Sequence, residues 1–118
     1  MPKINRAADY SEAQIKTAGK LKSLQMLHDG AVRFLKESLE DPKIKTENII
    51  KAQNIIAQLQ MCLRFDEGDM AELLFYLYDY MYIRLENHDN KSISDVLELF
   101  EHLLQSLKMM GLKRAQAA

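Results

Sequence analysis

The chain has little of what marks most extracellular and catalytic proteins. Its 118 residues include one cysteine, Cys62, so no disulfide can form within it. It has no tryptophan, two prolines and four glycines, which leaves few positions suited to sharp turns. It shows no signal peptide and no apolar run long enough to span a bilayer. We therefore expect a cytoplasmic protein that does not insert into membranes.

The charge is balanced, with 16 Lys and Arg residues against 17 Asp and Glu residues. A protein that binds nucleic acid through its phosphates normally carries a strong basic excess. The sequence therefore predicts no nucleic-acid partner.

Motifs that carry chemistry are also missing. We find no Glu-x-x-His pair, no Cys-x-x-Cys, no calcium-binding loop and no glycine-rich phosphate loop. The histidines, His28, His88 and His102, do not have the spacing of metal ligands. We expect no catalytic residue, no metal and no cofactor.

What the chain does have is helix-forming residues with a 3.6-residue apolar period. Four helices are predicted, with a proline stop after the first at Pro42 and a glycine stop after the last at Gly111. Their expected bounds are about Leu21–Leu39, Thr46–Arg64, Asp69–Asn87, and Ser92 or Ser94 to Met110, with Thr46 and one of the two serines as N-caps.

Short connections between helices of similar length favour antiparallel neighbours. The predicted fold is therefore all-α, an antiparallel four-helix bundle over residues 19–111. Residues 1–18 are expected to form an N-terminal strap or a short extra helix, and residues 112–118 a frayed tail.

The second and third helices have more apolar surface than a bundle needs. In the second, Ile50, Ala57 and Met61 form a stripe apart from the main core row. The third is apolar nearly all round. Its predicted inward row is Met70, Leu73, Leu74, Leu77, Tyr78, Met81 and Leu85. Two further stripes pair Phe75 with Tyr82, and Tyr76 with Ile83.

Such surplus stripes must meet the N-terminal strap, a second copy of the chain or a foreign partner. Tyrosine and methionine suit an adaptable surface, and grooves between helices commonly accept an extended or helical peptide. The residues alone leave these three occupants open.

Three blocks of sequence resemble the flagellar secretion chaperone (FliS) family. Met26-Leu27-His28-Asp29-Gly30-Ala31 resembles the family's Met-Leu-Tyr-Asp-Gly-Ala, with His28 in place of the usual tyrosine. Lys51-Ala52-Gln53-Asn54-Ile55-Ile56 resembles its Lys-Ala-Gln-Asp-Ile-Ile block, and Leu77-Tyr78-Asp79-Tyr80-Met81 its third-helix signature. Tyr10 and Thr17 have the spacing of the family's N-terminal segment.

The resemblance implies a four-helix bundle that binds the disordered C-terminal segment of flagellin, prevents premature polymerisation and delivers flagellin to the flagellar type III export gate. It also implies that the N-terminal segment with Tyr10 covers part of the binding surface. The expected state is a monomer or weak dimer, and the alternative function is a homo-oligomeric helical interaction module. The residues expected to contact the partner are Tyr10, Ile15, Ile50, Gln53, Ala57, Met61, Phe75, Tyr76, Tyr82 and Ile83.

Overall fold

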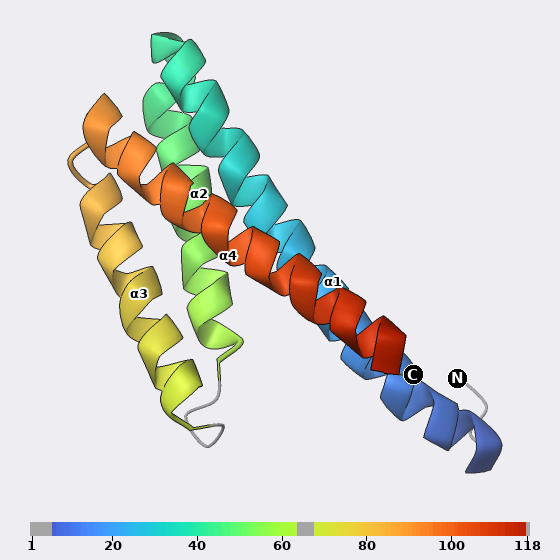
Figure 1. The fold of residues 1–118 in the computed structure, drawn as a ribbon. Helices are drawn as coiled ribbons and strands as arrows, with labels where there is room; N and C mark the ends of the chain where they lie inside the picture. Colours follow the sequence, from blue (N-terminus) through green and yellow to red (C-terminus); the bar gives the residue numbers. More distant parts are fainter. Residues whose placement is uncertain (1–5, 64–67, 118) are drawn as a thin grey trace.

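Four α-helices make up the described part of the chain, and successive helices run antiparallel (Figure 1). The computed structural model describes the backbone of residues 6–63 and 68–117, and the side chains of residue 19 and of residues 21–63 and 68–109. The predicted all-α antiparallel bundle is confirmed. Its elements are α1 (Arg6–Glu40), the 3-10 turn η1 (Pro42–Ile44), α2 (Lys45–Met61), α3 (Asp69–Leu85) and α4 (Asn90–Ala117).

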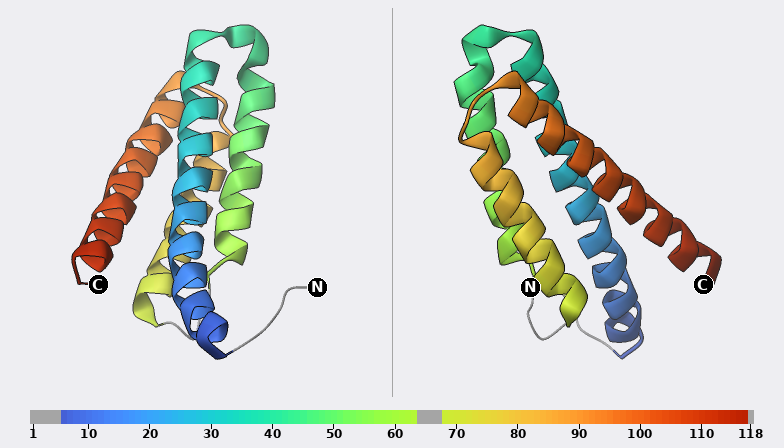
Figure 2. Two further views of the ribbon diagram at one scale, coloured as in Figure 1. Left: turned by 90° about the vertical axis from the view of Figure 1, so that its right-hand side faces the viewer. Right: turned by 60° about the vertical axis from the view of Figure 1, so that its left-hand side comes forward.

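The helices are arranged as a square. Helix α1 packs against α2 and α4, and α3 packs against the same two helices, so α1 and α3 lie on a diagonal. Helix α4 starts beside α3 at their connecting loop and diverges from it along its length (Figures 1 and 2). The N-terminal half of α3 is therefore less covered than its C-terminal half.

Helix α1 is longer than the sequence predicted, because it begins at Arg6 and not near Leu21. Residues 6–20 contain four alanines and two lysines, which are good helix formers, and no proline, so nothing interrupts the helix. The backbone of the expected strap is thus continuous with α1 from Arg6 onward. The side chains of residues 1–18 lie outside the described ones, and the separate role of this segment stays a prediction.

Helix α4 continues past Gly111 to Ala117, so the predicted stop at this glycine is wrong. A glycine inside a helix costs only about 0.5–1 kcal/mol relative to alanine. The residues that follow it are mostly good helix formers, and they outweigh this cost.

The turn between α1 and α2 follows the predicted proline stop. Helix α1 ends at Glu40, and the Asp41 carboxylate accepts a hydrogen bond of 3.0 Å from the Lys43 backbone N–H, with Pro42 at the first position of η1. Helix α2 starts at Lys45 and has no side-chain cap. The predicted cap at Thr46 is therefore wrong, because η1 leads directly into α2.

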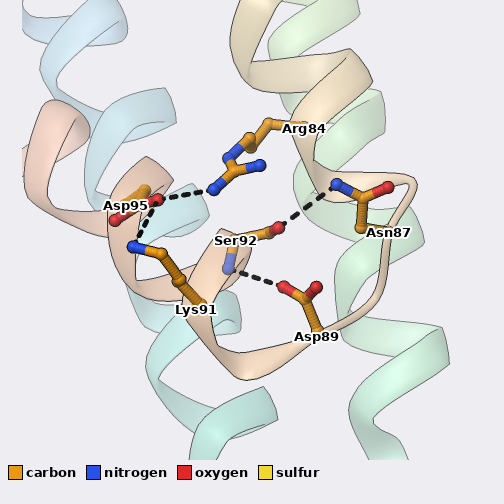
Figure 3. A network of polar contacts seen from close by, with 6 residues as sticks. All are labelled: Arg84, Asn87, Asp89, Lys91, Ser92 and Asp95. Atoms are coloured by element: carbon orange, nitrogen blue, oxygen red, sulfur yellow. Dashed lines mark hydrogen bonds and ion pairs between the residues drawn. The ribbon is translucent and has the colours of Figure 1, made fainter.

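The loop between α3 and α4 is held by a set of polar contacts (Figure 3). The Asp89 carboxylate accepts a hydrogen bond of 2.7 Å from the Ser92 backbone N–H, so Asp89 is the N-cap of α4. This corrects the expectation that Ser92 or Ser94 caps the helix. Hydrogen bonding to Ser92 also holds the pKa of Asp89 below its usual value.

Replacing Asp89 with alanine should lower the thermal midpoint of unfolding by about 5 °C, because the first turn of α4 loses its cap. Asp89→Asn should have a much smaller effect, since asparagine caps nearly as well. Calorimetric or circular dichroism melting of both variants measures the difference. Equal losses for the two would show that the carboxylate charge, and not capping, matters here.

An ion pair joins α3 to α4 next to this loop. The Arg84 guanidinium lies 2.8 Å from an Asp95 carboxylate oxygen, and Lys91 approaches the same oxygen at 3.7 Å (Figure 3). The hydrogen bond from Arg84 lowers the pKa of Asp95 below its usual value. These contacts fasten α3 to α4 at the end where the two helices are still close.

The core contains side chains from all four helices. Gly30 lies on the side of α1 next to α2, where a Cβ added to it would be in van der Waals contact with Ile55 Cδ1 at 3.4 Å. The fully enclosed apolar residues come from all four helices. They include Ala31, Leu35, Ile49, Ala52, Ile56, Met81, Leu85, Ile93, Val96 and Phe100.

Two residues assigned to the inward row of α3 are in fact exposed, Met70 by 66% and Leu73 by 64%. Leu73 lies on the side of α3 that is turned away from the bundle. Met70 lies near the N-terminal end of α3, where α4 has diverged (Figure 1). Only the rest of the predicted row, from Leu74 to Leu85, is buried or half-buried.

A buried hydrogen-bonded pair links α1 to α3 across the diagonal of the bundle. His28 Nδ1 lies 2.7 Å from the Leu24 carbonyl oxygen, which can only accept, so this nitrogen carries the proton. His28 Nε2 then accepts a hydrogen bond of 2.8 Å from the Tyr78 hydroxyl. The Phe100 ring packs edge-on against the imidazole with a centroid separation of 5.5 Å. Burial lowers the pKa of His28 and raises that of Tyr78 to about 12.

The free energy of unfolding should therefore fall as the pH drops below about 6.5, the pKa of an unfolded histidine. Because the folded state holds His28 neutral, the unfolded state binds the proton first, and the loss approaches about 1.4 kcal/mol per pH unit until the folded pKa is reached. Denaturation curves between pH 7 and pH 5 measure the slope. His28→Gln removes the titrating group, so parallel curves for the two proteins would contradict the assignment.

Candidate functional site

Helix α2 presents an apolar stripe to solvent beside α3. Met61 is 84% exposed and Ile50 is 49% exposed, with Ala57 half-buried between them. The three lie on one side of the helix, beyond the flank that contacts α3. The structure thus confirms that this stripe is separate from the core row of α2.

Two glutamines of α2 fix the position of α3. Gln53 Nε2 donates to the Tyr82 carbonyl oxygen, and Gln60 Nε2 donates to the Phe75 carbonyl oxygen, each at 3.1 Å. Gln53, predicted as a partner contact, is itself buried, so it joins the two helices instead of facing solvent. The two bonds are seven residues apart on both helices, which fixes the antiparallel register of α2 and α3.

The seven-residue spacing of Phe75 and Tyr82 puts both on the side of α3 that faces α2. Both side chains are half-buried there. The Phe75 ring also packs edge-on against Tyr76, at a centroid separation of 5.9 Å. Together with the α2 stripe these residues form what we call the α2–α3 face. It comprises Ile50, Ala57, Met61, Phe75 and Tyr82.

A row of carboxylates follows the α2–α3 face along α3. Glu72, Asp79 and Glu86 recur every seven residues, and all three are exposed. Tyr76 and Ile83, which the sequence analysis grouped with this site, lie on the far side of this acidic row. The structure therefore distributes the predicted contact residues over two surfaces, which touch where the Phe75 ring packs against Tyr76.

Sequence reasoning missed two exposed apolar residues on that second surface. Leu73 was assigned to the core, and Tyr80 was noted only as part of a motif. Leu73 and Tyr80 could have been found from the sequence, because together with Tyr76 and Ile83 they recur at alternating steps of three and four residues.

The remaining predicted contacts, Tyr10 and Ile15, have side chains outside the described residues. Within the part of the chain whose side chains are described, no group of three or more His, Cys, Asp or Glu residues is arranged to hold a metal ion. Among the described helices, none has a segment of the length and hydrophobicity needed to cross a membrane.

The order of these elements and the motifs on them match a known family. The model for "Flagellar protein FliS" covers residues 3–114. The chain belongs to the FliS family.

Two curated relatives carry the name "Flagellar secretion chaperone FliS". The one from Bacillus subtilis (strain 168) is 32% identical over 93 residues, which cover 75% of this chain and 69% of the relative. The one from Vibrio cholerae serotype O1 (strain ATCC 39315 / El Tor Inaba N16961) is 34% identical over 102 residues, which cover 78% of this chain and 75% of the relative.

Membership of the FliS family makes this chain a flagellar secretion chaperone and not an enzyme. Chaperones of this family are cytoplasmic. The family block Lys51–Ile56 lies on α2 and supplies Gln53, while the third-helix signature Leu77–Met81 supplies the Tyr78 partner of His28. The motifs of the FliS family thus include residues that hold the helices in register.

Proposed function

We propose that this FliS-family chaperone binds the disordered C-terminal segment of flagellin at the α2–α3 face. The observation that carries the proposal is the exposure of Ile50 and Met61 beside the half-buried Phe75 and Tyr82. The exposed parts of Ile50 and Met61 contribute no core packing to the isolated bundle, whereas Tyr82 also packs against the core. The exposed apolar side chains suit a partner that contributes apolar residues of its own.

Covering the flagellin segment would prevent premature polymerisation and keep the chain ready for export. The chaperone then delivers flagellin to the flagellar type III export gate. Because the segment orders on binding, its ordering cost of ~2–5 kcal/mol moderates the affinity and so favours release. No nucleotide is needed, since competition at the export machinery completes the transfer.

The N-terminal part of the chain, with Tyr10 and Ile15, takes part in the same function. In the structure, residues 6–18 continue α1 as helix, so this part of the helix has to separate from the rest of α1 to cover the α2–α3 face at rest, and flagellin then displaces it. The chaperone acts as a monomer or a weak dimer in this account. Removing residues 1–18 should then leave the face open and strengthen flagellin binding.

Met61→Asp should weaken binding of the flagellin C-terminal segment by about tenfold or more, because a charge would be buried against an apolar partner. The side chain is almost fully exposed, so the helical circular dichroism should not change. Titration calorimetry with the purified segment measures the affinity.

Met109→Asp is the matched control, since Met109 is also an exposed methionine and lies on α4, which does not contact α2 in the described structure. It should bind flagellin as the unaltered protein does. Equal affinity of the Met61→Asp variant and this control would remove the α2–α3 face from the proposal.

A further inference from the structure

A second apolar surface runs along the side of α3 that faces away from the bundle. It consists of Leu73, Tyr76, Tyr80 and Ile83, which we call the outer seam. These side chains are between 51% and 64% exposed. Steps of three, four and three residues place them in one line, the spacing of the a and d positions of a coiled coil.

Nothing in the described structure covers this seam. Helix α3 packs against α2 and α4 on its other sides, and the right-hand view of Figure 2 shows α3 in front with no described helix over it. Polar residues at both ends, Asp69 and Asn87, fall at the next positions of the same spacing. The seam is thus bounded and about 15 Å long, enough for two to three turns of a docked helix.

The two flanks of the seam differ in charge. On one side lies the acidic row of Glu72, Asp79 and Glu86, which make no ion pair with any described residue. On the other side, Arg84 is already bonded to Asp95. The acidic row is therefore the only flank with charge that remains to be matched by a partner in the described structure.

A second copy of the chain, docked through its own outer seam, would match the charges on the two flanks poorly. An antiparallel pair of seams would bring the two acidic rows face to face, where like charges repel. A parallel pair would set each acidic row against Met70, Leu77 and Arg84 of its partner, and the arginine is already engaged. Charge complementarity favours a different protein with basic residues on the facing flank.

We propose that the outer seam is a docking site for an amphipathic α-helix of a second protein, distinct from the carried flagellin. The docked helix has apolar residues at alternating steps of three and four, and Lys or Arg along the flank that meets Glu72, Asp79 and Glu86. The chaperone can then hold its export substrate on the α2–α3 face and a helical partner on the other side of the acidic row.

Designed peptides of about three heptads test this directly. One has leucine at a and d and lysine on both flanks, the second has glutamate on the flanks, and the third has the lysine composition in scrambled order. Calorimetry and circular dichroism should show that only the first binds and gains helicity, and that its binding weakens with salt because the acidic row is exposed. Equal binding of all three, or of none, would overturn the proposal.

Variants then locate the site. Tyr80→Asp should weaken binding of the lysine peptide by about tenfold and leave flagellin binding unchanged, whereas Met61→Asp should do the reverse. Combining Glu72→Lys, Asp79→Lys and Glu86→Lys should transfer the preference to the glutamate peptide.

Displacement of the lysine peptide by the flagellin segment would overturn the proposal, because the seam would then belong to the flagellin site. If Met61→Asp binds flagellin as the unaltered protein does, the α2–α3 face is not the flagellin site, and the proposal for the outer seam stands on its own result.

Discussion

Phe100→Ala should lower the free energy of unfolding by about 3–5 kcal/mol, the largest loss we expect from a single substitution in this chain. The Phe100 ring is fully enclosed and packs edge-on against His28 of α1, which in turn bonds to Tyr78 of α3, so its removal leaves a cavity beside this buried pair. Small domains have only about 5–15 kcal/mol of stability in total. The variant should therefore be partly unfolded near physiological temperature.

Urea denaturation followed by circular dichroism measures this loss, with Met109→Ala as the control. Met109 is exposed on the same helix, and its truncation should change stability by no more than about 0.5 kcal/mol. A loss below about 1 kcal/mol for Phe100→Ala would contradict the full burial of this ring beside His28.

Tyr78→Phe should cost about 1–3 kcal/mol although it removes a single oxygen atom. The Tyr78 hydroxyl donates to His28 Nε2 at 2.8 Å, and both residues are buried. Without the hydroxyl, the ring nitrogen of His28 keeps its desolvation cost and loses its partner.

Tyr76→Phe provides the matched control, since Tyr76 is exposed two residues earlier on α3. It should leave the free energy of unfolding within about 0.5 kcal/mol of the unaltered value. Similar stabilities of the two variants would show that the buried hydrogen bond contributes nothing, and would weaken the account of the pH dependence.

The number, order and direction of the helices could be predicted because α1, α2 and α4 have a clear apolar period, α3 is a long run of helix-forming residues, and the connections are short. The exact ends of the helices were harder to predict. Asp89, and not Ser92 or Ser94, caps α4, because several capping residues lie in succession and only the fold decides which one reaches a free N–H. Gly111 did not end α4, since good helix formers surround it.

The surface of α3 was only half predictable, for a physical reason. When a helix is apolar nearly all round, its sequence pattern does not show which side faces the core. Leu73 was therefore assigned to the core although it is exposed. Met70 is on the flank toward α4, and its exposure follows from the divergence of the two helices, which no local pattern encodes (Figure 1). The role of Gln53 in holding α3 likewise depends on the register of two helices.

Titration calorimetry of the whole chaperone with the C-terminal segment of flagellin from the same genome tests the central claim most directly. We expect saturable binding with a negative heat-capacity change, together with helicity gained by the segment, because apolar surface is buried as the segment folds. A folded, monomeric protein that shows no binding would contradict the account, and the α2–α3 face would then belong to another partner.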